Sequence, residues 1–301
     1  MTTLIKKLIK NPIELGRYLL NGKCLQINAG LLILLAASSS VSAQAIGLRN
    51  QTWSAEVIRS HGQPVIPLFD GWYPNDDGSS TICFGFFNMN TEQALDIPAG
   101  DANYLTTDYP GLDLSDALLP THFDPLPPAY RHVFCAFSIN VPAGFNSSHR
   151  ITWHLTANGQ NLEVPGKVIP SYVLDEPRSN GRGDVAPLVS LRENGMAVRG
   201  RTGIHYPEVI ETRVNQALTL AATIEHSDAS VWVGWAHHSG PGQVEFDKKE
   251  YETESGSATQ VEARFSEPGE YVVRMQTIDD IAAFEFYCCH TNAYFHITVN
   301  D

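Results

Sequence analysis

The fold class of this chain follows from the pattern of Val261-Glu-Ala-Arg-Phe265-Ser-Glu-Pro268-Gly269-Glu-Tyr271-Val-Val-Arg274. Apolar and polar residues alternate from Val261 to Phe265, and an apolar run resumes at Tyr271. Alternation with a period of two is typical of a β-strand that buries one face. Pro268-Gly269 lies between the two runs and indicates a tight turn. The stretch therefore predicts two β-strands joined by a short connection.

The same pattern continues along the chain from Thr52, with turn residues between the apolar runs. It predicts strands over residues 52–58, 65–69, 80–88, 132–141, 149–157, 161–168, 188–191, 205–210, 217–225, 230–236, 243–247, 260–265, 270–277 and 293–299. No helix longer than two turns is expected in this region. Residues 97–128 are rich in Pro, Asp and Gly, and predict a loop with one short strand near residues 118–123.

The predicted fold class is all-β, with two immunoglobulin-like β-sandwich domains after an N-terminal signal segment. Seven or eight short strands in about 110 residues are typical of such a sandwich. A polar, glycine-rich break without apolar periodicity separates the two halves at residues 175–184. We predict a signal peptide at 1–45, an N-terminal β-sandwich domain at 46–176, a linker at 177–186 and a second domain at 187–301.

The first 45 residues have the features of a secretory signal. Lys6, Lys7, Lys10, Arg17 and Lys23 precede an apolar run at residues 29–37, which is shorter than the ~20 residues that a membrane span needs. Small residues then occupy the positions that signal peptidase requires, at residues 41–43 and 43–45. The prediction is export to the periplasm or the extracellular space, and an uncleaved anchor is the alternative. No membrane span is expected after cleavage.

Charge excludes one class of partner. The 301 residues include 20 basic and 33 acidic side chains, so the formal net charge is −13. Cleavage after Ala43 would remove five of the basic residues and one acidic residue, which leaves −17. A chain this acidic, without a basic tract, is a poor binder of nucleic acid. We therefore expect no nucleic-acid partner.

The second half carries a pattern of Trp235, Gly240-Pro241-Gly242 and Phe246, followed by residues 261–274. This pattern resembles the PKD-type (polycystic-kidney-disease-like) repeats of secreted bacterial proteins over roughly residues 205–299. The Trp-Asp-Phe-Gly-Asp-Gly motif of those repeats is missing. The resemblance implies an immunoglobulin-like fold that acts as a spacer or a binding module, with Trp235 and Phe246 on the core faces of neighbouring strands.

The first half also resembles a known group of proteins, over about residues 65–177. The similarity lies in motifs at residues 71–72, 75–79, 84–90, 120–123, 153–155 and 174–176. The group consists of secreted bacterial proteins that pair such a region with an immunoglobulin-like domain. The resemblance implies a fold and no particular chemistry.

Four cysteines remain after the signal. Cys83 and Cys135 lie within apolar strand runs, and in an oxidising compartment they predict a disulfide between two core strands. Closing the loop of 52 residues would contribute roughly 4 kcal/mol. Two buried thiols are the alternative. Cys288-Cys289-His290 is ambiguous between a vicinal disulfide, inert or intermolecular thiols, and a copper or zinc site with His296 nearby. We assign no metal and no cofactor.

Catalysis finds little support in the sequence. The chain lacks Gly-x-Ser-x-Gly, Ser-x-x-Lys and His-Glu-x-x-His, and it has no phosphate-binding loop or dinucleotide motif. No catalytic residue is assigned. The acidic turn at residues 75–79 predicts a hairpin rather than calcium binding.

Aromatic residues are the better indication of binding. The candidates in or beside the loops of the first half are Trp72, Tyr73, Tyr104, Tyr109 and Phe123. The alternative is that Trp72 and Phe123 close the ends of the core. The predicted function is an exported, non-enzymatic binding or structural module for a protein or polysaccharide ligand. The alternatives are a secreted hydrolase with its site at residues 97–130, and a periplasmic metal-binding protein.

Overall fold

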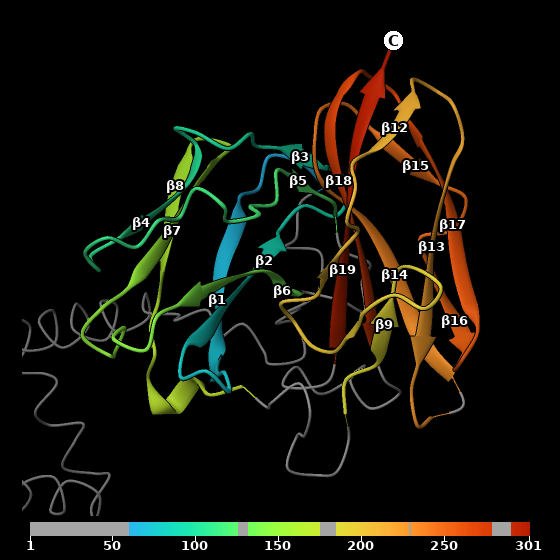
Figure 1. Ribbon diagram of the computed structural model, residues 1–301. Helices are drawn as coiled ribbons and strands as arrows, with labels where there is room; N and C mark the ends of the chain where they lie inside the picture. The colour runs from blue at the N-terminus through green and yellow to red at the C-terminus, as the bar shows by residue number, and fades with distance from the viewer. Residues whose placement is uncertain (1–59, 126–131, 175–184, 229, 279–289) are drawn as a thin grey trace, which may run out of the picture. The chain divides into compact units, whose positions relative to one another are not determined.

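The computed structural model describes residues 60–125, 132–174, 185–228, 230–278 and 290–301 (Figure 1). These residues contain β-strands and a single turn of 3₁₀-helix, η2 (Pro170–Tyr172), so the all-β prediction is confirmed. None of them belongs to a helix long and apolar enough to cross a membrane. The predicted signal segment, the strand at 52–58, the break at 175–184, Cys288 and Cys289 lie outside the described residues.

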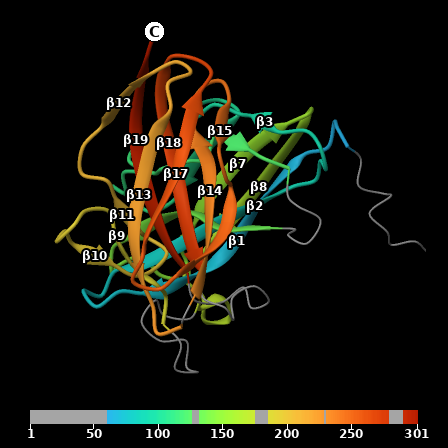
Figure 2. The same cartoon turned by 90° about the vertical axis from the view of Figure 1, so that its right-hand side faces the viewer.

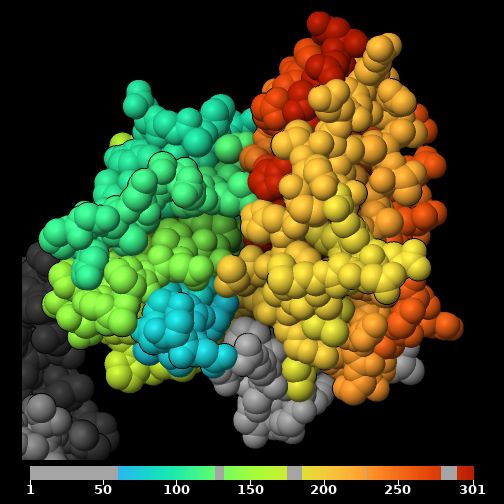
Figure 3. All heavy atoms as spheres, in the orientation of Figure 1, coloured from blue at the N-terminus to red at the C-terminus, as the bar shows by residue number. Residues whose placement is uncertain are grey.

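The described residues between 60 and 174 form the first sandwich. Its strands are β1 (Val65–Pro74), β2 (Ser80–Asn88), β3 (Leu95–Asp96), β4 (Asn103–Thr107), β5 (His122–Phe123), β6 (Val133–Val141), β7 (Ile151–Ala157) and β8 (Gln160–Gly166). They form one sheet in the order β1-β2-β6, a second in the order β4-β7-β8, and a small pair β3-β5. The prediction of a loop with one strand at residues 97–128 was incomplete, because β4 also lies there and pairs with β7. β4 has only five residues between turn signals, which is too few to show a clear apolar period. Figure 3 shows the segment around β4, in teal, on the surface of the first sandwich.

Three aromatic rings fill the centre of the first sandwich. Phe84 stacks on Phe137 with centroids 5.3 Å apart, and Trp153 meets Phe137 edge-on at 5.0 Å. The indole Nε1 of Trp153 donates a 2.9 Å hydrogen bond to the buried Oδ1 of Asn103. Burial of such rings is the main stabilising term, and the hydrogen bond removes the cost of burying the indole N–H.

The described residues between 185 and 301 form the second sandwich. Its strands are β9 (Leu188–Ser190), β10 (Ala197–Val198), β11 (Ile204–His205), β12 (Ile210–Arg213), β13 (Leu218–Glu225), β14 (Ser230–Ser239), β15 (Val244–Phe246), β16 (Glu250–Glu254), β17 (Ala258–Phe265), β18 (Gly269–Ile278) and β19 (His290–Asn300). One sheet has the order β10-β9-β13-β17-β15, and the other has the order β11-β19-β18-β14-β16 with β12 also paired to β19. Figures 1 and 2 show the two sheets as layers.

Residues 261–274 connect these two layers. β17 belongs to one sheet and β18 to the other, so the turn through Pro268 carries the chain across the sandwich. Phe265 and Tyr271, on either side of the turn, meet in the core with centroids 4.8 Å apart. Gly269 has φ of 149°, and a Cβ there would lie 2.6 Å from Pro241. Only glycine fits this close approach without a clash.

Trp235 and Phe246 both face the core of the second sandwich, as expected. They do not lie on neighbouring strands, because β14 and β15 belong to different sheets. The predicted strand at 205–210 is in fact two short strands, β11 and β12, both parallel to β19.

Residues Ile58–Asp301 form one compact unit, so the two sandwiches are in contact. The side chains of β18 and β19 that point out of the second sandwich reach backbone carbonyls of β6. Arg274 Nη1 lies 3.4 Å from the carbonyl oxygen of Ala136. Asn292 Nδ2 lies 3.4 Å from the carbonyl oxygen of Cys135 and donates a 2.8 Å bond to Arg201 O. The contact is therefore polar as well as buried.

Candidate functional site

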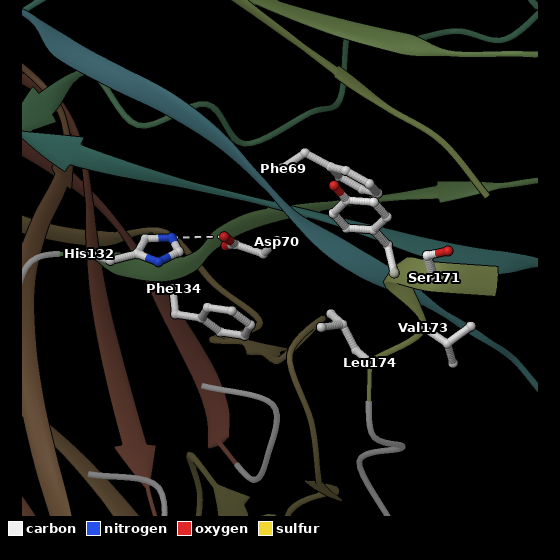
Figure 4. Close-up of a pocket in the computed structure, with 8 residues that line it drawn as sticks. Phe69, Asp70, His132, Phe134, Ser171, Val173 and Leu174 are labelled. Atoms are coloured by element: carbon white, nitrogen blue, oxygen red, sulfur yellow. Dashed lines mark ion pairs between the residues drawn. The ribbon is translucent and has the colours of Figure 1, made fainter. Parts of the chain in front are cut away.

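A pocket of about 330 Å³ opens on the first sandwich beside the middle of β1 and the start of β6 (Figure 4). It is lined by Phe69, Asp70, His132, Phe134, Ser171, Tyr172, Val173 and Leu174. β1 contributes the first two side chains, β6 contributes Phe134, and the turn η2 contributes Ser171 and Tyr172.

Asp70 reaches the pocket because β1 is irregular at this point. The register of β1 against β2 shifts between Phe69 and Gly71, so Asp70 has no partner in the ladder. A bulge of this kind re-aims a side chain. The Asp70 carboxylate accepts a 2.6 Å hydrogen bond from the backbone N–H of Cys135. It also pairs with Nε2 of His132 at 2.7 Å.

Gly85, on β2, makes room for this pair. A Cβ at this position would collide with Asp70, with the carbonyl oxygen of Val133 and with His132. The close approach of these groups thus depends on a residue that has no side chain.

The Asp70–His132 pair is unequally exposed. The side chain of Asp70 is 1% exposed and that of His132 is 21% exposed. Burial raises the pKa of Asp70 above its ordinary value, although His132, the N–H of Cys135 and the charge of Arg201 act against this shift. A ligand in the pocket would therefore meet the imidazole of His132, while the carboxylate orients that imidazole from behind.

The walls of the pocket are aromatic. The Phe69 and Tyr172 rings lie 5.2 Å apart at an angle of 33°. On the other side, Phe134 meets the His132 ring nearly edge-on at 5.5 Å. Tyr172 and its neighbour Val173 are 47% and 49% exposed, and both are large hydrophobic residues at the surface.

Trp72 holds the turn that carries Tyr172. Its indole Nε1 donates a 2.7 Å hydrogen bond to the carbonyl oxygen of Ile169, just before η2. Its own carbonyl oxygen accepts a 2.7 Å bond from Leu174 N–H, just after η2. Gly71 lets the turn come this close, because a Cβ there would lie 2.5 Å from Tyr172 O. Trp72 therefore positions the pocket wall.

Ser171, His132 and Asp70 are the residue types of a hydrolytic triad, but their order in space is different. The Nε2 atom of His132 is occupied by Asp70. Figure 4 shows Asp70 between His132 and Ser171, with the serine hydroxyl directed away from the imidazole. A nucleophilic serine requires the imidazole beside its hydroxyl. This arrangement suits recognition better than acyl transfer.

The structure does not gather the five candidate aromatics into one site. Only Trp72 adjoins the pocket. Tyr73 is buried and its hydroxyl lies 2.9 Å from Thr202 Oγ1 of the second sandwich. Phe123 is fully buried in the core, and Tyr109 is half-buried. Tyr104 is 40% exposed and stacks on His154 at 4.5 Å.

A disulfide joins Cys83 of β2 to Cys135 of β6, with Cα atoms 4.9 Å apart. It lies directly behind the pocket floor, because the N–H of Cys135 is the donor to Asp70. Cys288 and Cys289 lie outside the described residues. Within the part of the chain that the structure describes, no cluster of three or more His, Cys, Asp or Glu side chains is arranged to hold a metal ion.

The residues that form the pocket were not singled out from the sequence. One signal was present for Asp70, which interrupts the apolar run of β1 between Phe69 and Gly71. A carboxylate inside a buried strand needs a partner, and this identifies it as unusual. His132 lies far away in sequence, so the partner itself could not be identified.

No known family model matches this chain, and no curated protein sequence matches it. The solved structures that are similar to this chain include the D00-D0 domain of intimin, which is 11% identical in sequence. The match covers 79% of this chain and 100% of that chain, with a TM-score of 0.27. Adhesin InvE of Yersinia pseudotuberculosis is 10% identical, and the match covers 80% of this chain and 59% of that chain with a TM-score of 0.24. WR4, a C. elegans MSP family member, is 10% identical, and the match covers 31% of this chain and 94% of that chain with a TM-score of 0.25. Similarity at this level bears on neither ligand nor activity.

Proposed function

We propose that this chain is an exported, non-catalytic binding module of the bacterial envelope or exterior. Its partner would be a protein that inserts an aromatic side chain, flanked by basic residues, into the pocket between Phe69, Phe134 and Tyr172. The observation that carries the proposal is the exposed pair Tyr172 and Val173 at the mouth of an aromatic pocket.

Exposed apolar side chains next to a pocket favour a protein ligand. Single exposed hydrophobic residues are ordinary, whereas adjacent ones beside a concave apolar site are typical of interaction surfaces. Tyrosine is enriched among the residues that dominate binding energy at interfaces. The His132 imidazole adds a polar group that could fix the orientation of the inserted side chain.

Charge favours a basic partner over a second copy of this chain. The predicted mature chain carries a formal charge of −17. Two copies would repel each other, whereas a basic segment would be attracted and its association accelerated.

Two further observations support export and a non-catalytic role. The Cys83–Cys135 disulfide is chemically compatible with an oxidising compartment, which agrees with the predicted signal segment. The position of Ser171 on the far side of Asp70 from His132 offers no activated nucleophile in this pocket.

The proposal can be tested by site-specific photo-crosslinking in the cells that make the protein. A benzophenone amino acid would replace Tyr172 in one strain and Tyr104 in another, since Tyr104 is similarly exposed but lies away from the pocket. We expect one discrete crosslinked partner protein from position 172 and none from position 104. The purified partner should then bind Tyr172→Ala at least tenfold more weakly than the Tyr104→Ala variant.

Other results would contradict the proposal. A crosslink from position 172 to a second copy of this chain would indicate self-association instead. Equal crosslinking from both positions, or no crosslink at 172 in a correctly exported protein, would remove the pocket as the binding site.

A further inference from the structure

Two histidines meet on the face of β19 that points out of the core of the second sandwich, and neither of them lines the pocket. β11 runs parallel to β19, and its register places His205 opposite Tyr294. His296 lies two residues after Tyr294, so its side chain is on the same face of the strand. Nδ1 of His205 and Nε2 of His296 are 3.0 Å apart. The two rings are nearly parallel, with centroids 5.3 Å apart and an angle of 16°.

We propose that His205 and His296 bind one late transition-metal ion, with Cu²⁺ the preferred metal. This site goes beyond the proposed binding function and does not depend on it.

The distance between the two nitrogens suits a shared metal ion. Two imidazole nitrogens bound to one metal at ~2.0–2.1 Å lie roughly 3 Å apart when the angle at the metal is near 90–110°. His205 and His296 already have this separation, so only a small rotation of the rings is needed. One nitrogen now donates its proton to the other. On binding, that ring would move its proton to its second nitrogen, and the pair would remain neutral.

The surroundings hold the rings and leave the ion accessible. The His205 ring stacks on the buried Tyr294 ring at 4.8 Å, which limits its rotation. His205 itself is exposed and His296 is half-buried, so an ion can arrive from solvent. Partial loss of solvent around each ring lowers the pKa of both histidines, and for His205 the neighbouring His296 lowers it further. The shift favours neutral imidazole, which is the form that binds metals.

Nearby polar groups are already occupied. Nε2 of His238 lies 2.9 Å from the carbonyl oxygen of Leu118. The carboxylate of Glu270, on β18, accepts hydrogen bonds of 3.0 and 2.9 Å from Thr298 Oγ1. The site therefore supplies two nitrogen ligands, and water would complete the coordination.

This ligand set favours copper. Imidazole nitrogens suit Cu²⁺, Ni²⁺ and Zn²⁺, and Cu²⁺ binds most tightly in this series. Structural zinc sites use four protein ligands, which the pair does not provide. The formal charge of −17 expected for the mature chain would also raise the local concentration of cations.

The test uses the mature protein without a polyhistidine tag, titrated with Cu²⁺ and followed by electron paramagnetic resonance. The expected result is one Cu²⁺ per chain with hyperfine splitting from two imidazole nitrogens. His205→Ala and His296→Ala should each weaken binding at least tenfold. His154→Ala is the matched control, because His154 also lies on a strand and stacks on a tyrosine but has no histidine partner in its described contacts. It should bind as the wild type does.

Two outcomes would overturn the proposal. The first is binding that persists in the His205→Ala variant but disappears in the Cys288→Ser/Cys289→Ser double variant, which would place the metal elsewhere. The second is the absence of stoichiometric Cu²⁺ binding to the folded wild type. Thermal unfolding of each variant in EDTA separates loss of a ligand from loss of the fold. The Tyr172→Ala variant should keep its copper, so the two proposals can fail independently.

Discussion

The imidazole ring of His122 stacks on that of His237 with centroids 4.3 Å apart, although the two residues belong to different sandwiches. Nδ1 of His122 lies 2.6 Å from Asp96, and its Nε2 lies 3.2 Å from Asp124. Lys249, of the second sandwich, pairs with the other oxygen of Asp124 at 3.1 Å. A ring with a carboxylate on each nitrogen is favoured in the protonated form. The two carboxylates therefore favour the cationic form of His122, whose ring faces His237.

The two histidines are shifted in opposite directions. Burial acts to lower the pKa of His122, but the hydrogen bonds and charges of Asp124 and Asp96 outweigh it and raise the pKa. Burial, followed by the charge of His122, lowers the pKa of His237 to about 4. Both ring nitrogens of His237 are buried without a hydrogen-bond partner. Burial therefore favours the neutral form of the His237 ring near pH 7.

Acid should weaken the contact between the sandwiches. A histidine whose pKa is lowered in the folded state does not change the free energy of unfolding above its unfolded pKa, near 6.5. The free energy of unfolding falls as the pH drops from there to the pKa of the folded state. For His237 this window runs from about 6.5 to about 4, with a cost of roughly 3 kcal/mol at its lower end. His122 contributes in the opposite sense, since its stabilisation is complete below 6.5 and is lost as the pH rises through its raised pKa.

The His237→Phe variant tests this coupling. Phenylalanine keeps an aromatic ring against His122 but does not titrate, so the melting temperature should fall less between pH 7 and pH 4.5 than in the wild type. Differential scanning calorimetry across this range gives the comparison. If the melting temperatures of the two proteins fall equally between pH 7 and pH 4.5, His237 is not the source of the acid sensitivity.

The Cys83–Cys135 bridge should contribute a large share of the stability. Replacing both cysteines by serine is expected to lower the free energy of unfolding by about 4 kcal/mol, because the unfolded chain regains the freedom of a 52-residue loop. Urea unfolding with and without a reductant measures this. The double variant should itself be insensitive to the reductant, and a wild type that is equally insensitive would argue against the bridge.

Gly85→Ala should damage the pocket floor without touching the pocket walls. The new methyl group would collide with Asp70 and His132, so the pair must separate or the strand must shift. We expect a loss of about 1–3 kcal/mol in the free energy of unfolding. Gly195→Ala is the control, because a Cβ there would meet only Arg192, at 3.1 Å, on an exposed turn. Equal stability of the two variants would contradict the described geometry.

Trp72→Phe isolates one hydrogen bond. The ring remains, but the donor to the carbonyl oxygen of Ile169 is lost, and the turn η2 is no longer held at that end. The expected cost is about 1 kcal/mol, with faster amide hydrogen exchange at Tyr172 and Leu174. Hydrogen-exchange mass spectrometry measures both effects, and Tyr104→Phe serves as the comparison. Unchanged exchange at η2 would mean that Trp72 does not position it.

Several features could be predicted from local sequence because they depend on neighbours along the chain. The alternation at residues 149–157 and 260–265 predicts strands that the structure contains as β7 and within β17. β4 was missed, since five residues beside proline and glycine carry too little period. The split of residues 205–210 into β11 and β12 was also missed, because both segments are defined by pairing with β19.

The all-β class, and the burial of one face in strands such as β7 and β17, can be read from the sequence alone because they follow from residues two positions apart. Which side chains face each other depends on the tertiary structure. Asp70 meets His132, His122 meets His237 and His205 meets His296 across separations of 62, 115 and 91 residues. Such pairs depend on the order of strands in the sheets and on the contact between the sandwiches. Apolar periodicity specifies which face of a strand is buried, but it does not specify which strand lies beside it.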